Sequence, residues 1–126
     1  MRTFVLLGAV FGGVAVATGA FAAHALAPRV EPRMLEVFET AARYQMFHAL
    51  ALFAVAWVWQ QTGARAARVA GWAFVLGIVL FSGSLYAMVF SGVRALGMIT
   101  PLGGVAFVVG WAALAAAAWR MRASEP

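Results

Sequence analysis

Four long apolar segments constrain the fold of this chain more than any other feature of its sequence. They run from Thr3 to about Ala27, from about Tyr44 to Trp59, from Val69 to about Phe90 and from about Leu102 to Trp119, and none contains Asp, Glu, Lys or Arg. A helix needs about 20 apolar residues, within a range of about 17–25, to cross the hydrocarbon core of a bilayer. The first and third segments meet this length directly, whereas the second and fourth need flanking residues. We therefore predict an all-α fold, a four-transmembrane-helix antiparallel bundle that forms a single domain over residues 1–126.

The composition excludes water as the main solvent of this chain. Its 126 residues are 65% hydrophobic and only 10% charged, whereas a soluble domain is about half apolar and about a quarter charged. The formal charge of +5 comes from arginines that stand singly or in pairs between the apolar runs. Such a distribution is typical of anchors at lipid head groups and lacks the basic stripe of a nucleic-acid-binding surface. We expect the lipid bilayer as a partner and no nucleic acid.

The connection before the second segment differs from the other two. PRVEPRMLEVFETAAR (28–43) begins with a proline-bounded turn and reads as helix from about Pro32, because proline suits the first turn of a helix. We expect this helix to continue into the second segment as an extra-membrane helical extension. QTGARAAR (61–68) and SGVRALGMIT (91–100) are short connections, after which Thr100 is expected to cap the last helix, with Pro101 in its first turn.

The arginines give a small bias to the orientation. With four crossings, both termini and the 61–68 connection share one side, which carries five arginines against four on the other side. Cytoplasmic segments carry an excess of Lys and Arg. We therefore predict a multi-pass protein of the cell (inner or plasma) membrane with both termini in the cytoplasm. The cytoplasmic set is Arg2, Arg65, Arg68, Arg120 and Arg122, and the opposite set is Arg29, Arg33, Arg43 and Arg94.

The stretch GAFAAHAL (19–26) imitates a signal-peptide cleavage site, because Ala20-Phe21-Ala22 has the required small-x-small form. The apolar run from Thr3 to Phe21 is longer than the apolar region of about 7–15 residues that a signal peptide carries. We expect GAFAAHAL to remain in the protein as the close-packed end of the first helix.

Glycine and alanine form small-xxx-small rows inside the segments, such as Gly8-x-x-x-Gly12 and Ala15-x-x-x-Gly19-x-x-x-Ala23. Small residues let helix backbones approach closely in lipid. These rows predict tight packing inside the bundle, or the contact face of a homo-oligomer. The candidate packing residues are Gly8, Gly12, Gly19, Gly77, Gly83, Gly103 and Gly104.

Polar side chains gather toward the side of the bundle opposite the termini. Both histidines are expected there at similar depth, one near the exit of the first segment and one about a turn inside the second. Polar groups in hydrocarbon cost several kcal/mol unless they are hydrogen-bonded. The sequence therefore predicts a polar cluster with members from all four segments: His24, Tyr44, His48, Ser82, Ser84, Tyr86 and Thr100.

Three explanations of this cluster remain open. The side chains can lock the helices by interhelical hydrogen bonds, form a site for an unidentified small molecule or ion, or form a metal or haem site with His24 and His48 as axial ligands. The sequence has no CxxCH motif, and we predict no cofactor and no metal. It also has no Asp, no Cys and no Gly-rich phosphate loop. We therefore do not expect an enzyme.

Four motifs together resemble a known family. GAFAAHAL (19–26), FETAARYQMFHALAL (38–52), LFSGSLYAMV (80–89) and TPLGGVAFVVGWAAL (100–114) are similar in content and order to the YgdD/YwdK-like small integral membrane proteins, the domain of unknown function DUF423. The resemblance implies a four-helix protein of the bacterial plasma membrane and implies no activity. It covers the polar residues above and adds Gln45. One departure is Ala22, where family members commonly have glycine.

Two functions follow as expectations. The first is a structural or accessory membrane protein with a hydrogen-bonded polar cluster at one side of the bundle. The second is a small transporter, a channel subunit or a binder of lipid or small molecules that uses His24, His48 and Tyr86.

Overall fold

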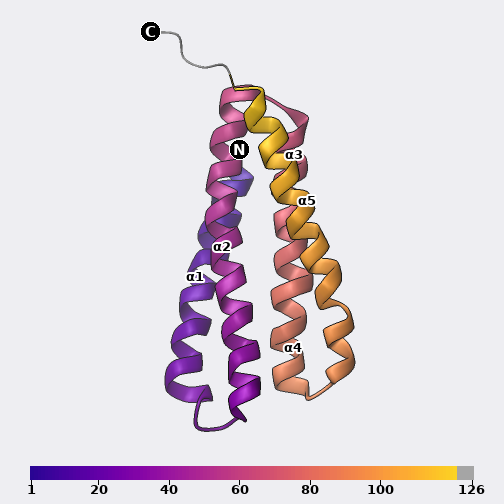
Figure 1. Ribbon diagram of the computed structural model, residues 1–126. Coiled ribbons are helices and arrows are strands. Elements are labelled where there is room, and N and C mark those ends of the chain that lie inside the picture. The colour runs from indigo at the N-terminus through magenta and orange to yellow at the C-terminus, as the bar shows by residue number, and fades with distance from the viewer. Residues whose placement is uncertain (122–126) are drawn as a thin grey trace.

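The computed structural model describes residues 1–121 and consists of long helices packed side by side (Figure 1). Arg122, one of the arginines used for the orientation, lies outside the described residues. The described residues form helices and connecting turns without any strand. The α-helices are α1 (Arg2–Phe21), α2 (Pro32–Thr62), α3 (Arg65–Gly77), α4 (Gly83–Ser91) and α5 (Thr100–Trp119), and the shorter turns are η1 (Ala22–Leu26), η2 (Ile78–Ser82) and η3 (Arg94–Met98).

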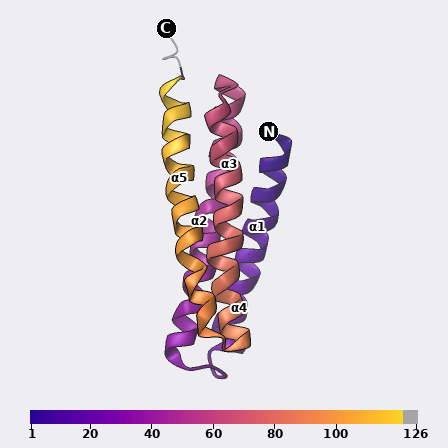
Figure 2. The same ribbon diagram turned by 90° about the vertical axis from the view of Figure 1, so that its right-hand side faces the viewer.

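Two π-helical turns extend or join the helices. In η1 the wider turn prolongs α1, and in η2 it links α3 and α4 into one continuous rod. As Figures 1 and 2 show, α1 and the α3–η2–α4 rod run in one direction, and α2 and α5 run in the other. The N-terminus, the turn after α2 and the end of α5 therefore lie at one end of the molecule, and we call this the terminal end.

Within residues 1–121, three helices are long and apolar enough to cross a membrane: Arg2–Leu26, Arg65–Ser91 and Arg94–Trp119. The helix α2 is not among them: its start carries Arg33, Glu36, Glu39 and Arg43, and its uncharged remainder contains the polar residues Gln45, His48, Gln60 and Gln61. Its 31 residues measure about 46 Å at 1.5 Å per residue, which exceeds the hydrocarbon thickness of about 30 Å. The prediction of one continuous helix from Pro32 is confirmed.

The helix ends follow ordinary rules with one exception. Gly63 and Gly92 end α2 and α4 with φ of +62° and +72°, a region that favours glycine, and donate their N–H groups to Trp59 and Met88. The prediction that Thr100 caps α5 is wrong. Thr100 is already inside the helix, Ile99 precedes it as the cap residue without a side-chain bond, and the Thr100 hydroxyl is used in an interhelical contact described below.

The buried apolar residues form two clusters. The larger one fills the bundle from the terminal end to its middle and includes Phe4, Leu52 and Phe74. The smaller one lies near the opposite end and consists of Ala22, Leu26 and Phe38. Ala22, where the family resemblance leads us to expect glycine, is only 1% exposed. The methyl group is therefore accommodated inside the smaller cluster.

Aromatic rings lie directly on glycines where the helices approach one another. A Cβ atom on Gly77 would overlap the ring of Phe107, and one on Gly103 would overlap the backbone of Phe81. A Cβ on Gly8 would lie 2.9 Å from the carbonyl oxygen of Ala49. These three glycines therefore pack helices, as predicted, and Gly12 lies at ordinary contact distance from α2.

The other predicted glycines do not pack helices within one chain, and their place at the contact face of a homo-oligomer stays a prediction. Gly19, Gly83 and Gly104 have nothing within 4 Å of an added Cβ, because each points away from the neighbouring helix. Two glycines outside the predicted set do pack helices. The Phe4 ring covers Gly71, and the Phe74 ring covers Gly110.

Candidate functional site

A chain of hydrogen bonds connects α1, α2 and α4. The Gln45 amide nitrogen donates to the Phe11 carbonyl at 2.8 Å, and the Tyr86 hydroxyl donates to the Gln45 amide oxygen at 2.9 Å. The Thr18 hydroxyl lies 3.1 Å from the Tyr86 hydroxyl. Gln45 is 3% exposed, so this amide depends on these protein partners.

The direction of donation in this chain is fixed by its two ends. A backbone carbonyl only accepts, so the nitrogen of Gln45 must face Phe11 and its oxygen must face Tyr86. The Tyr86 hydroxyl donates its single proton to that oxygen and therefore accepts a hydrogen bond from the Thr18 hydroxyl. The Thr18 proton is shared with the Ala15 carbonyl, 3.1 Å away in the same helix.

Two serines make further contacts between helices. The Ser82 hydroxyl, in η2, donates to the Ala41 carbonyl of α2 at 2.7 Å and is fully buried. The Ser84 hydroxyl donates to the Phe81 carbonyl at 2.9 Å and lies 2.7 Å from the Thr100 hydroxyl. Because Ser84 has given its proton to Phe81, Thr100 is the donor in that pair. These bonds tie η2 to α2 and α4 to α5.

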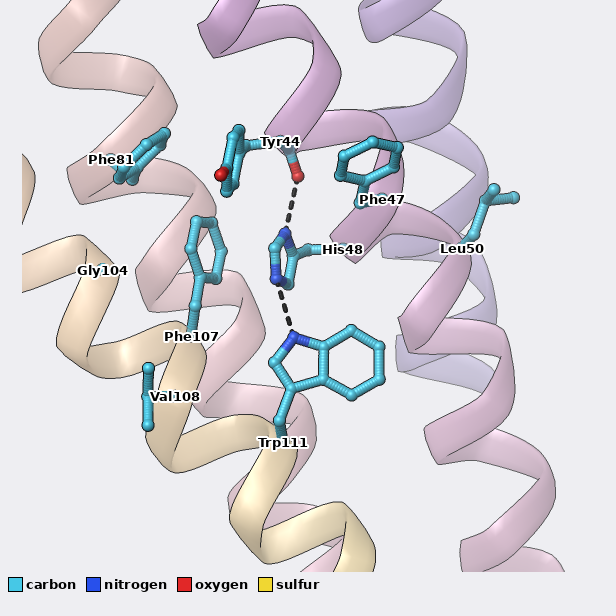
Figure 3. Close-up of a pocket in the computed structure, with 9 residues that line it drawn as sticks. All are labelled: Tyr44, Phe47, His48, Leu50, Phe81, Gly104, Phe107, Val108 and Trp111. Carbon is cyan, nitrogen blue, oxygen red and sulfur yellow. Dashed lines mark hydrogen bonds between the residues drawn. The ribbon is translucent and has the colours of Figure 1, made fainter.

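His48 forms a separate contact between α2 and α5. Its Nδ1 lies 2.7 Å from the Tyr44 carbonyl, and Trp111 Nε1–H donates to its Nε2 at 3.0 Å (Figure 3). An indole nitrogen only donates, so Nε2 accepts and Nδ1 carries the proton. The ring also stacks on Phe107, with centroids 3.5 Å apart and planes 9° apart. His48 is thus a neutral imidazole with both nitrogens in use.

His24 does not join these contacts. It lies exposed in η1, whereas His48 lies 16 residues beyond the start of α2, about 24 Å along that helix. The prediction that the two histidines share one depth is wrong, because α2 begins well before its apolar stretch. Among the other predicted residues, Tyr44 contributes its carbonyl, and Gln45, His48, Ser82, Ser84, Tyr86 and Thr100 contribute side chains.

The polar side chains of the described residues leave no buried nitrogen or oxygen without a partner. Within residues 1–121, no group of three or more His, Cys, Asp and Glu residues lies close enough to hold a metal ion. A haem between the two histidines would require His48 to release Trp111, because Nε2 has a single lone pair. Six of the predicted side chains therefore make hydrogen bonds between helices, which we call the polar layer, and His24 makes none.

Two contributors were not predicted from the sequence. Thr18 is one of the few polar residues of the first apolar segment, and its side chain could have been included on that ground alone. Trp111 stands in the middle of the fourth segment and is 47% exposed. A tryptophan in an apolar run gives no sign that its N–H reaches a histidine on another helix.

An aromatic groove lies beside His48, between α2, η2 and α5 (Figure 3). Its volume is about 590 Å³. The lining is almost entirely apolar, and the His48 ring lies among the aromatic side chains in the middle. The lining residues are Tyr44, Phe47, His48, Leu50, Phe81, Gly104, Phe107, Val108 and Trp111.

Comparison with known proteins places this chain in a family. Residues 18–104 match the family model described as protein of unknown function (DUF423). The UPF0382 membrane protein YwdK of Bacillus subtilis is 44% identical over 119 residues, which cover 94% of this chain and 97% of YwdK. A UPF0382 membrane protein of Staphylococcus aureus is 43% identical over 122 residues, covering 95% of this chain and 98% of its own length.

A third UPF0382 membrane protein, from Staphylococcus saprophyticus, is 45% identical over 111 residues, covering 88% of this chain and 92% of its own length. No solved structure matches.

Proposed function

This chain belongs to the DUF423 family of membrane proteins, and we propose that it is a structural or accessory membrane protein whose polar layer fastens a four-crossing bundle. The observation that carries the proposal is that the hydrogen-bonding groups of this layer are satisfied within the protein. Each buried polar side chain of the described residues finds a partner inside the protein. Groups that serve a ligand would instead present free donors or acceptors toward a cavity.

A fourth crossing by α2 is supported by the part of this helix that follows Arg43. From Tyr44 to Thr62 the sequence has no Asp, Glu, Lys or Arg. These 19 residues span about 28 Å, close to the thickness of the hydrocarbon core. Gln45 and His48 in this stretch bond to α1 and α5, which hold it beside two membrane-length helices. The preceding charged turns of α2 would extend from the membrane.

A transporter or channel that uses His24, His48 and Tyr86 is less well supported. His24 is exposed at the end of α1, Tyr86 is bonded to Gln45, and His48 is bonded to Trp111. The three side chains therefore do not face one cavity. Catalysis by a serine and a histidine is also not part of the proposal, because Ser82 and Ser84 bond to backbone carbonyls and Thr100.

Thermal unfolding in detergent tests the proposed role of the polar layer. Gln45→Leu removes both bonds of this amide and should lower the stability by about 1–2 kcal/mol, since interhelical bonds in membranes average about 0.6 kcal/mol each. Ser91→Ala is the control, because Ser91 is exposed and makes only local bonds: its hydroxyl donates to the Ala87 carbonyl and accepts from the Val93 N–H, so no interhelical bond is lost. Equal melting temperatures for the two variants would contradict the proposal.

The orientation is a proposal that rests on the arginine bias. An epitope inserted at Gly63, in the exposed turn after α2, should be protected from antibody in intact cells and accessible after lysis. Accessibility in intact cells would place the turn outside and reverse the orientation.

Self-association is a further part of the proposal. Gly19 lies exposed on α1 and Ala23 lies exposed in η1, where small residues leave room for a second helix. Cross-linking in native membranes should yield a dimer or trimer. If cross-linking yields only the monomer, self-association is contradicted, and the proposed role of the polar layer in holding the helices together is unaffected.

A further inference from the structure

The aromatic groove beside His48 has the shape of a trough along the helix axes. On α5, Gly104, Phe107 and Trp111 line it, and the first and last of them lie seven positions apart, about 10 Å along the axis. The outer rings are only half covered by protein, since Phe47 is 50% exposed and Trp111 is 47% exposed. The trough is therefore open sideways, toward the surface that the bundle presents to lipid.

Only one hydrogen-bonding side-chain group in the lining remains free. His48 uses both ring nitrogens, and Trp111 uses its N–H. The hydroxyl of Tyr44 has no hydrogen-bond partner among the described residues, and Figure 3 draws its oxygen without a bond to the other lining side chains. Tyr44 is 38% exposed. A hydroxyl at the edge of hydrocarbon gains free energy from a partner, so the groove offers one free donor at the end nearest Tyr44.

A positive charge stands at the same end of the groove. Arg43 precedes Tyr44 and is the last charged residue of α2 before its uncharged stretch, so it marks the level of the lipid head groups. It is exposed. Phe47 lies four residues later and Leu50 seven residues later, so all three share one face of α2. Arg43 therefore lies one helical turn before Phe47, on the face of α2 that carries the groove-lining residues Phe47 and Leu50.

From this arrangement we infer that the groove binds one phospholipid molecule of the surrounding bilayer. The phosphate pairs with Arg43, an ester carbonyl accepts the Tyr44 hydroxyl proton, and an acyl chain lies in the trough as far as Trp111. Along the helix axis the protein presents first a cation, then a hydrogen-bond donor and then an apolar trough. A phospholipid has its phosphate, ester and acyl chain in the same order. The trough also runs along the helix axes, as acyl chains do.

This inference is independent of the fastening role of the polar layer. The lipid would contact Arg43, Tyr44 and the outer rings, whereas the layer bonds of Gln45, Tyr86, Ser82 and Ser84 are made by residues that do not line the groove. A groove without lipid would leave those interhelical bonds in place. Loss of the bonds would be seen as unfolding, and loss of the lipid would be seen in the bound mass.

Native mass spectrometry of the protein purified from bacterial membranes in mild detergent tests the inference. The wild type should retain one phospholipid mass per chain. Gly104→Leu places a side chain into the groove, where an added Cβ meets nothing within 4 Å, and should lower the retained fraction at least ten-fold. Gly13→Leu is the matched control, because Gly13 is exposed on α1 and also has no neighbour within 4 Å of an added Cβ. It should retain the lipid.

A second pair of variants tests the polar contacts without filling the groove. Tyr44→Phe removes only the hydroxyl and should weaken binding of phosphatidylglycerol, added back to delipidated protein, by about 2- to 10-fold, which corresponds to one hydrogen bond. Arg43→Gln should weaken it to a similar degree. Diacylglycerol, which lacks the phosphate, should bind the wild type and Arg43→Gln equally.

Several outcomes would overturn the inference. They are a wild type that retains no phospholipid, a Gly104→Leu variant that retains as much as Gly13→Leu, and a Tyr44→Phe variant with unchanged phosphatidylglycerol binding. An isoprenoid quinone retained in place of a phospholipid would contradict the lipid class. A dimer that dissociates in Gly104→Leu would assign the groove to a second copy of the chain.

Discussion

Two contact regions of the bundle hold helices together by different means. In the glycine seam, between the α3–η2 rod and α5, aromatic side chains or their backbone lie on Gly77, Gly103 and Gly110. In the polar seam, α2 is joined to α1, η2 and α4 through Thr18, Gln45, Ser82 and Tyr86. Lipid gives no hydrophobic drive for helix association, so close packing and hydrogen bonds must supply the stability. We infer that the glycine seam determines how closely the helices approach, whereas the polar seam determines which helices lie next to each other.

The largest effect is expected in the glycine seam at Gly103. A Cβ there would overlap the backbone of Phe81, which cannot move without shifting η2. Gly103→Ala should therefore lower the free energy of unfolding by about 3 kcal/mol. The neighbouring Gly104→Ala is the control, because its Cβ meets open space. Chemical unfolding in detergent should give a lower free energy of unfolding for Gly103→Ala than for Gly104→Ala. Equal values would show that the helices are not closely packed at Gly103.

A smaller effect is expected at Gly77. An added Cβ overlaps the Phe107 ring, and this ring is also stacked on His48. The ring can move more easily than backbone, so Gly77→Ala should cost about 1–2 kcal/mol. The shift should also disturb the His48–Trp111 bond, which tryptophan fluorescence can detect. An unchanged spectrum and an unchanged stability would argue against this contact.

The polar seam should respond less to a single change. Ser82→Ala removes the bond to the Ala41 carbonyl but leaves that carbonyl inside a helix. We expect a loss of about 0.6 kcal/mol, the average for interhelical bonds in membranes. A loss greater than that of Gly103→Ala would invert the ranking of the two seams.

The sequence predicts the helices well because apolar length and turn residues decide them locally. The long α2 follows from Pro32 and the absence of a break before Gly63. Of the polar residues of this seam, Ser82 and Tyr86 were predicted because polar groups in apolar segments must find partners, Gln45 was added by the family resemblance, and Thr18 was missed. Their partners were not predicted, because these depend on how each helix is rotated and shifted against its neighbours.

Adjacent glycines show this limit most clearly. Gly103 and Gly104 are equivalent in sequence, yet one packs against Phe81 and the other opens into the groove. Successive residues differ by about 100° around a helix, and only the packed structure fixes which one faces inward. For the same reason, the sequence predicted neither the bond from Trp111 to His48 nor the position of His24 outside the polar layer.

A double-mutant cycle of Gln45→Leu and Tyr86→Phe tests the fastening role of the polar layer most directly. The Tyr86 hydroxyl donates to the Gln45 amide oxygen at 2.9 Å, so the two substitutions should not be additive. We predict a coupling energy of about 0.6 kcal/mol or more, up to about 1.7 kcal/mol, from unfolding of the four proteins in detergent. Strictly additive losses, or no loss in either single variant, would contradict the account.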